Sequence, residues 1–410
     1  MSSRSADAAR TPQPEAQSAP AAGGPSRLRV LRSLPELASV REAWLRLQDD
    51  QIVADPDFFA ASQSDPAVVR PHVVVLERDG EVEAMLVARI ELLRLRSRLG
   101  YKTVFAPEVR SITVLNGGIL GAVDEDTFRQ MLAGIRNSLA EGEADIAIFR
   151  YLPVDSPFYR IASTEVPFLG RQHFGDSEVR WELELPASVD DILRLSSRKT
   201  RQRLQGYVRK LERTHEGGLS LRRYTEPGEI DDFFRDVEAI APKTYQHALG
   251  VALGDTPVHR ERIGLCLERG WFRGYVLSID GRPCSFQYGE LYRGRFRLGR
   301  PGYDPALAHL RVGTYLLLKA FDDLCRDETA RIVDFGIGEA DYKERFGTTS
   351  VREGNVIVYA PTFRGARLNL TRTALQTGIR ASKRVAGRGK LARSLKRRFR
   401  QRARPSDGSS

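Results

Sequence analysis

The segment Arg331–Thr348 (RIVDFGIGEADYKERFGT) places several side chains that can do chemistry close together. Its apolar pair Ile332-Val333 is typical of a buried strand, and the glycines that follow favour a turn. A short charged helix then carries Tyr342 and Lys343. A phenol can protonate a leaving group, and an ammonium can stabilise a developing oxyanion or hold an anionic substrate. The alternative is that the Tyr342 ring packs in the core and Lys343 caps the surface.

A second group of residues, Arg311-Val312-Gly313-Thr314, falls where a helix is expected to begin and to run to Cys325. The first turn of a helix presents free backbone N–H groups and the positive end of the dipole, which suit a pyrophosphate. Arg311 would add a charge-assisted contact, and Gly313 would let phosphate oxygens approach. An ordinary helix start explains the same residues.

Two carboxylates near these elements are candidates for the base that takes a proton from an attacking group. Glu290 lies on the strand expected after Cys284, and Asp341 directly precedes Tyr342. Each of them also fits an ordinary surface charge.

The run Ser196–Arg213 predicts a helix with an apolar stripe and a strongly basic face. Its first residues, Arg198, Lys199 and Arg201, together with Asp334, form the predicted substrate-binding group. A basic face of this kind attracts a substrate that carries phosphate or uronic acid. A solvated linker helix between domains is the competing interpretation.

The predicted elements occur in the same order twice, about 190 residues apart: hairpin, strand, glycine loop, helix, strand. The hairpins turn at Asp79-Gly80 and Asp280-Gly281, which are typical hairpin dipeptides. Two similar α/β domains are therefore expected, with a boundary near Pro186. In the first copy a loop at 116–118 meets a helix whose first residues, 124–126, are all acidic. These acids would repel a phosphate, so we expect this copy to shape the cleft without catalysing.

Length and composition restrict the class of protein. A chain of 410 residues is long enough for about two domains. Its three scattered cysteines predict neither a disulfide framework nor a zinc site, and we expect no metal. No apolar run approaches the ~20 residues of a membrane span, and the N-terminus has no apolar signal core. These features predict a cytoplasmic protein with a disordered N-terminal segment, 1–26, rich in Ala, Pro, Ser and Gly.

The net charge of +11 comes from the C-terminal end. Residues 364–404 hold 15 Lys/Arg and no acid, whereas residues 1–363 carry 49 basic and 52 acidic residues. Such a basic tail, 364–410, can lie on an anionic membrane at the inner face, bind nucleic acid nonspecifically or remain disordered. Its few aromatic residues make nucleic acid the less favoured partner.

Several of these motifs resemble the GNAT acyltransferase superfamily. The order of elements, Gly313 and the pattern from Tyr342 to Phe346-Gly347 carry this resemblance. Residues 197–201, 302–305 and the block from 334 to 343 further resemble its BioF-type, CelD-like branch, which is related to the FemABX aminoacyltransferases. One departure is that Arg311 stands where the phosphate loop of the superfamily usually has its first glycine.

The resemblance implies an α/β fold of tandem GNAT-like domains, each a mixed, mostly antiparallel sheet flanked by helices. Residues 27–186 would be a degenerate copy, and residues 187–363 the acyltransferase domain. It further implies an acyl-CoA co-substrate, expected to be acetyl-CoA, Tyr342 as general acid, and a sugar of a bacterial exopolysaccharide or envelope precursor as acceptor. The alternatives are FemABX-like transfer from aminoacyl-tRNA and a non-catalytic adaptor in exopolysaccharide biogenesis.

Overall fold

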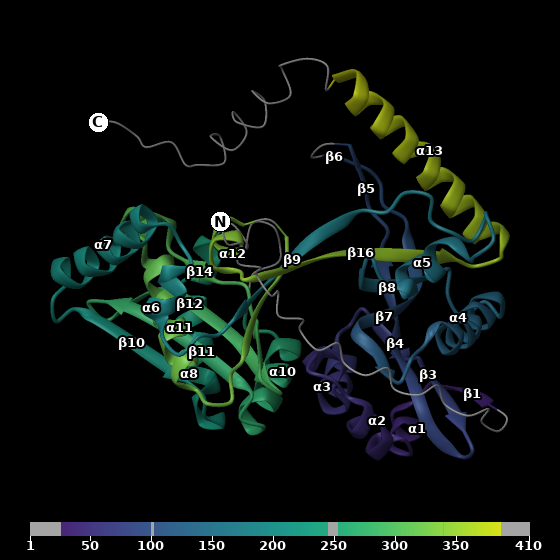
Figure 1. Cartoon of the computed structure of the whole chain (residues 1–410), viewed down its shortest axis with the longest axis horizontal. Helices are drawn as coiled ribbons and strands as arrows, with labels where there is room; N and C mark the ends of the chain where they lie inside the picture. The colour runs from purple at the N-terminus through teal and green to yellow at the C-terminus, as the bar shows by residue number, and fades with distance from the viewer. Residues whose placement is uncertain (1–25, 100–101, 245–252, 339, 387–410) are drawn as a thin grey trace, which may run out of the picture.

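The computed structural model describes residues 26–99, 102–244, 253–338 and 340–386. The segment expected to be disordered lies outside this part of the chain, apart from Ser26. One mixed sheet of 14 strands runs through the molecule, with helices on both faces (Figure 1). The sheet therefore connects the two halves of the chain.

The N-terminal half extends from β1 to α5. Its elements in chain order are β1 (Ser26–Leu31), α1 (Leu34–Ala38), α2 (Arg41–Leu47), η1 (Ile52–Ala54), α3 (Pro56–Ala61), η2 (Ser62–Ser64), β2 (Val68–Pro71), β3 (Val73–Arg78), β4 (Glu81–Arg94), β5 (Ser97–Leu99), β6 (Lys102–Phe105), β7 (Glu108–Gly121), α4 (Glu125–Ala140), β8 (Ile146–Pro153) and α5 (Pro157–Thr164).

The C-terminal half begins with β9. Its elements are β9 (Ser177–Glu184), α6 (Val189–Arg194), α7 (Arg198–Thr214), β10 (Leu219–Tyr224), η3 (Pro227–Glu229), α8 (Ile230–Glu238), η4 (Ala241–Lys243), α10 (Pro257–Glu268), β11 (Phe272–Ile279), β12 (Arg282–Tyr292), β13 (Arg295–Leu298), β14 (Gly302–Tyr303), η5 (Pro305–Leu310), α11 (Val312–Arg326), β15 (Ile332–Ile337), α12 (Asp341–Phe346), β16 (Thr349–Tyr359) and α13 (Phe363–Ala386).

Both halves contain the predicted order of elements. The hairpins β3–β4 and β11–β12 are antiparallel, whereas β7 pairs with β8, and β13 with β15, in parallel. The predicted fold class, a mixed and mostly antiparallel sheet flanked by helices, is confirmed. The loop expected at 116–118 was wrong, because these residues continue β7. Gly117, with φ of 66°, lets the strand bend there.

At the centre of the sheet, a strand of the C-terminal half pairs with a strand of the N-terminal half. The strand order is β1-β3-β4-β7-β8-β16-β9-β15-β13-β12-β11-β10. Strand β16, from the end of the chain, therefore bonds to β8 of the N-terminal half on one side and to β9 on the other. Figure 1 shows β9 and β16 running between the halves. The boundary expected near Pro186 falls just after β9, which itself pairs with β15.

Helix α3 fastens the halves together from outside the sheet. Its neighbouring residues Phe58 and Phe59 are both buried, but Phe58 packs into the C-terminal core and Phe59 into the N-terminal core. Before this helix, Asp55 accepts a hydrogen bond of 2.9 Å from the hydroxyl of Tyr292. These contacts join residues more than 230 positions apart in sequence.

A buried arginine joins four strands at the junction. Arg180 on β9 donates to Asp334 of β15 at 2.6 Å and to both carboxylate oxygens of Glu353 of β16 at 3.0 Å. Its guanidinium also lies 5.9 Å from the ring centre of Tyr151 on β8. The left-handed Gly336, at φ of 65°, belongs to a bulge in β15, and its amide donates to Asp334 at 2.7 Å.

Helix α13 belongs to the fold where it begins. Leu368 is buried, and the side-chain amide of the buried Asn369 donates to the carbonyls of Leu169 and Arg171. The segment expected as a basic tail thus starts as a packed helix. Across the described residues, no helix combines the length and apolar character needed to cross a membrane.

We expect Arg180→Met to lower the free energy of unfolding by about 3–5 kcal/mol at pH 7, because it leaves two buried carboxylates without their counter-charge. Burial already raises the pKa of Glu353 above 4.5, and loss of the arginine raises it further. A carboxyl with a raised folded pKa stabilises the fold below its unfolded pKa and loses this contribution as pH rises through the folded value. Urea unfolding should therefore show a smaller deficit at pH 4.5 than at pH 7.

The matched control is Arg46→Met, which breaks an exposed ion pair with Glu81 at 3.4 Å. Such pairs are worth about 0–1 kcal/mol. Equal losses in the two variants, or a deficit at position 180 that does not change with pH, would contradict the assigned role of Arg180.

Candidate active site

The parallel strands β13 and β15 separate after a short common stretch. They pair from Arg295 with Ile332 to Arg297 with Asp334. Beyond this point the chain leaves β13 for β14, which pairs with β12, while β15 bulges and continues along β9. Side chains on both faces of the sheet therefore lie near the point where β13 and β15 separate.

One face of the sheet carries a row of ionisable side chains at this point. Pairing places Glu290, Arg297, Asp334 and Glu182 next to one another on successive strands. Glu290, the predicted base, is buried and lies 3.1 Å from the guanidinium of Arg297. This ion-paired oxygen, Oε2, makes no hydrogen bond of good geometry within the described residues, and neither does Nε of Arg297. A buried carboxylate with spare acceptor capacity is well suited to take a proton.

Asp334 has no exposed surface, and both of its oxygens are used by Arg180 and the Gly336 amide. Asp334 is therefore enclosed and fully engaged within the chain, and its predicted contact with substrate stays a prediction.

The opposite face carries the aromatic side of the site. Tyr342, at the start of α12, packs its ring edge-on against Phe335 with 5.9 Å between centres, next to the core of the C-terminal half. Lys343 is buried and donates to the carbonyls of Gly336 at 3.2 Å and Ile337 at 2.7 Å. Burial lowers the pKa of Lys343. These two hydrogen bonds attach Lys343 to the end of β15. Asp341, the other predicted base, is exposed.

The start of α11 is open to an anion. Arg311 adopts a left-handed conformation, with φ of 59°, and no side chain caps the helix. Val312 is buried, and Gly313 and Thr314 are half-buried. A Cβ placed on Gly313 would meet the Tyr303 ring no closer than 3.4 Å, an ordinary contact. There is therefore room beside Gly313, while the amides of Thr314 and Tyr315 both donate to the Arg311 carbonyl at 3.0 Å.

Helix α7 lies beside α11 and runs in the same direction. Arg311 at the start of α11 lies 5.5 Å from the ring centre of Tyr207, and Tyr315, one turn later, donates to Glu212 at 3.1 Å. Residues 198–201 of α7 therefore extend past the start of α11. Arg198 and Lys199 are exposed there, and Arg201 is half-buried. This arrangement brings the predicted substrate-binding cations toward the predicted phosphate site.

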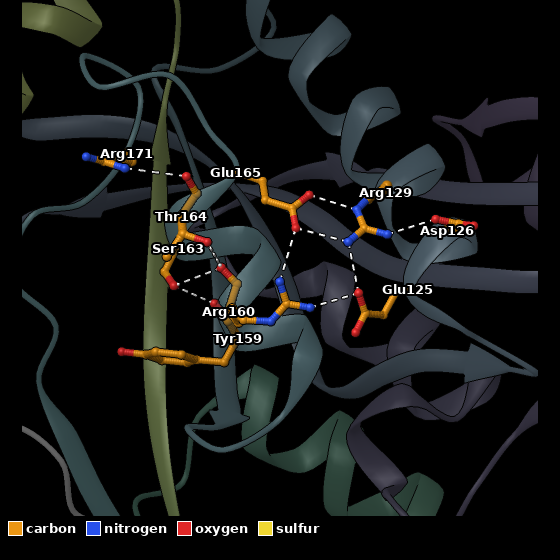
Figure 2. A network of polar contacts seen from close by, with 9 residues as sticks. All are labelled: Glu125, Asp126, Arg129, Tyr159, Arg160, Ser163, Thr164, Glu165 and Arg171. Carbon is orange, nitrogen blue, oxygen red and sulfur yellow. Dashed lines mark hydrogen bonds and ion pairs between the residues drawn. The ribbon is translucent and has the colours of Figure 1, made fainter.

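The equivalent helix of the N-terminal half has the opposite charge at its start. Asp124 caps α4 by accepting from the amide of Thr127 at 2.7 Å. Figure 2 shows the adjacent Glu125 and Asp126 engaged by Arg129 and by an arginine of α5. A helix start filled by a carboxylate and flanked by acids does not attract phosphate.

Sequence reasoning missed Arg180, Arg297, Glu182 and Glu353. Arg297 offered a clue, because it stands between the apolar Phe296 and Leu298 and so had to occupy one face of a short buried strand. Arg180 offered none.

Comparisons with known proteins agree with this geometry. Residues 198–344 match the model of the acetyltransferase (GNAT) domain family. No curated protein sequence matches the chain.

Several solved structures are similar in fold. FemX has a TM-score of 0.54 at 11% identity over 78% of this chain and 95% of its own. A tandem GNAT protein from the clavulanic acid biosynthesis pathway gives 0.48 at 12% identity, over 82% and 99%. L-PGS from Bacillus licheniformis gives 0.46 at 14% identity, over 83% and 96%.

The matched residues include the open start of α11, the diverging strands β13 and β15, and both Tyr342 and Lys343. Residues 198–344 therefore match the GNAT acetyltransferase domain, and the fold of the chain is similar to that of FemX.

Proposed function

We propose that the protein is an acyl-CoA-dependent acyltransferase, with acetyl-CoA as donor and its active site in the C-terminal half. The observation that carries this proposal is the contrast between the two equivalent helix starts. Helix α11 begins without a side-chain cap beside two diverging strands, whereas α4 begins with a capping carboxylate and two further acids. One half is therefore prepared for a pyrophosphate and the other is closed to it.

The donor phosphates would be held by the first turn of α11. The amides of Val312 and Gly313 and the side chain of Arg311 would supply hydrogen bonds and charge, and the small Gly313 would keep the approach open. The exposed Arg198 and Lys199 of α7 add positive charge beyond this helix start. These cations compensate for the missing first glycine of the usual phosphate loop.

The donor supplies a thioester carbonyl that an amine or hydroxyl can attack directly. Glu290 would take the proton of the attacking group, and Arg297 would keep the carboxylate oriented. Tyr342 would give a proton to the departing thiolate from the other face of the sheet. Arg180, Asp334 and Lys343 hold the end of β15 between these groups. The reaction needs no covalent enzyme intermediate, because positioning and paired proton transfers suffice.

We propose a sugar of an envelope polysaccharide or its precursor as acceptor, on the resemblance to the BioF-type, CelD-like branch. The basic start of α7 supports an acceptor that carries phosphate or uronic acid.

A second candidate is transfer of an aminoacyl group from tRNA. The exposed basic face of α7, which includes Arg203, Arg209 and Lys210, supports it because such a face suits an RNA backbone. Titration with acetyl-CoA and with aminoacyl-tRNA separates the two candidates. A chain that binds neither donor would be the non-catalytic adaptor.

We expect Gly313→Glu to abolish binding of acetyl-CoA in calorimetric titration, because a carboxylate would occupy the place of the phosphate oxygens. Glutamate is well tolerated in the first turn of a helix, so the melting temperature should not fall. Gly313→Ala is the matched control: its methyl group has room beside Tyr303, and binding should stay within about threefold of the parent. Equal affinity in the glutamate variant would refute the phosphate site.

We expect Tyr342→Phe to lower turnover by roughly 10²-fold or more, the usual range for a lost proton donor, with little change in acetyl-CoA affinity. The phenylalanine keeps the ring against Phe335 and removes only the hydroxyl. Steady-state kinetics with an identified acceptor measures the effect. Tyr315→Phe, which loses a hydroxyl bonded to Glu212 further along α11, should keep parental turnover. Near-parental turnover at position 342 would move the role to Lys343.

A further inference from the structure

A group of large apolar side chains is exposed where α13 begins. Phe363 is 84% exposed, Phe168 61%, and Leu169 and Leu370 each 50%. Water-exposed aromatic and leucine side chains in one place are uncommon on a monomer, and they mark surfaces that contact a partner or a membrane.

Hydrogen bonds show that these four residues form one surface. Asn369 donates to the carbonyl of Leu169 at 2.8 Å, which places the next residue, Leu370, beside the Phe168-Leu169 pair. Phe363 and Leu370 are seven residues apart on α13 and therefore lie on one face of the helix. We call Phe168, Leu169, Phe363 and Leu370 the apolar patch.

The apolar patch borders a groove of about 540 Å³. The groove lies between α4, the segment 166–170, the end of β16 and the start of α13, and Leu169 and Phe363 contribute to its lining. Most of its other lining side chains are apolar, including Leu139, Val166 and Val358. A hydrocarbon chain therefore has space inside the groove as well as contact with the apolar patch.

Positive charge surrounds the apolar patch. Arg136 lines the groove, and the guanidinium of Arg171 lies 5.6 Å from the ring centre of Phe168. Helix α13 contributes the exposed Arg364, Arg367 and Arg380 and contains no acid, whereas its half-buried Arg372 donates to the Tyr359 hydroxyl. Among these arginines, Arg364 is partly neutralised by Asp145 at 2.9 Å. Eleven further basic residues follow between 381 and 404 in the sequence.

We propose that this face docks on an anionic phospholipid bilayer. The apolar patch enters the interfacial region, an acyl chain occupies the groove, and the exposed arginines of α13 contact the headgroup phosphates. A second copy of the chain is a poor occupant, because its identical face carries the same positive charge. Nucleic acid matches the charge, and its bases can stack on a phenylalanine, but it has no hydrocarbon to cover the two leucines or to fill the apolar groove.

The test is co-sedimentation of the full chain with vesicles of phosphatidylglycerol and phosphatidylcholine at low salt. Phe168→Ser with Phe363→Ser should weaken binding about tenfold or more, because each aromatic side chain that enters the interface contributes substantially to partitioning. Leu221→Ser is the matched control, since Leu221 is 45% exposed on β10, away from α13. It should bind as the parent does. Pure phosphatidylcholine vesicles should retain little protein.

A second measurement reports insertion directly. In a Phe363→Trp variant, anionic vesicles should shift the added emission to the blue, and brominated lipids should quench it beyond the signal of the parent tryptophans. Parental vesicle binding by the double serine variant, or an unshifted emission of the introduced tryptophan in bound protein, would overturn the proposal. So would retention on tRNA without retention on vesicles. Acetyl-CoA titration of the same variants is independent of these outcomes and reports only on the proposed enzymatic function.

Discussion

The junction between the halves depends on the buried guanidinium of Arg180. Burying a charge is costly unless opposite charges and hydrogen bonds accompany it, and here two carboxylates from different strands supply both. The arginine can be accommodated only when β9, β15 and β16 are in register, so it selects one arrangement of the sheet centre. The same contact holds Asp334 beside the point where β13 and β15 separate. The buried Arg180 therefore fixes both the register at the centre of the sheet and the position of Asp334 beside the proposed site.

The two halves have the same order of elements but different uses. In the N-terminal half, helix α4 connects the parallel strands β7 and β8. Asp124 closes its start, and ion pairs within the same half surround it. In the C-terminal half the equivalent helix, α11, has no side-chain cap, and the neighbouring α7 adds cations beyond the start of α11. Aromatic residues of α3 then fasten the first half onto the second. The N-terminal copy supports the proposed site without needing one of its own.

Hydrophobic periodicity and turn dipeptides were enough to predict the repeated order of elements, because each depends only on neighbouring residues. They could not predict that β16 returns to β8, since strand partners are chosen by contacts between distant segments. The position of Arg180 was hidden for a related reason: in an alternating strand a charged residue is ordinarily exposed. Tyr342 was expected just past the end of a strand, and it lies on α12 after β15, while its role as general acid stays a prediction. The carbonyl contacts of Lys343 depend on the bulge at Gly336, which a sequence pattern does not specify.

The pairing of β16 with β8 also means that the sheet is completed late during synthesis. Strand β8 ends at residue 153, yet its partner is not available until residue 359 has left the ribosome. Over these roughly 200 residues of translation, at about 5–20 residues per second, the nascent chain carries an unpaired sheet edge made of Ile146, Ala147 and Ile148. An unpaired strand edge of this kind can pair with another chain, and truncation before β16 would leave the edge of β8 uncovered.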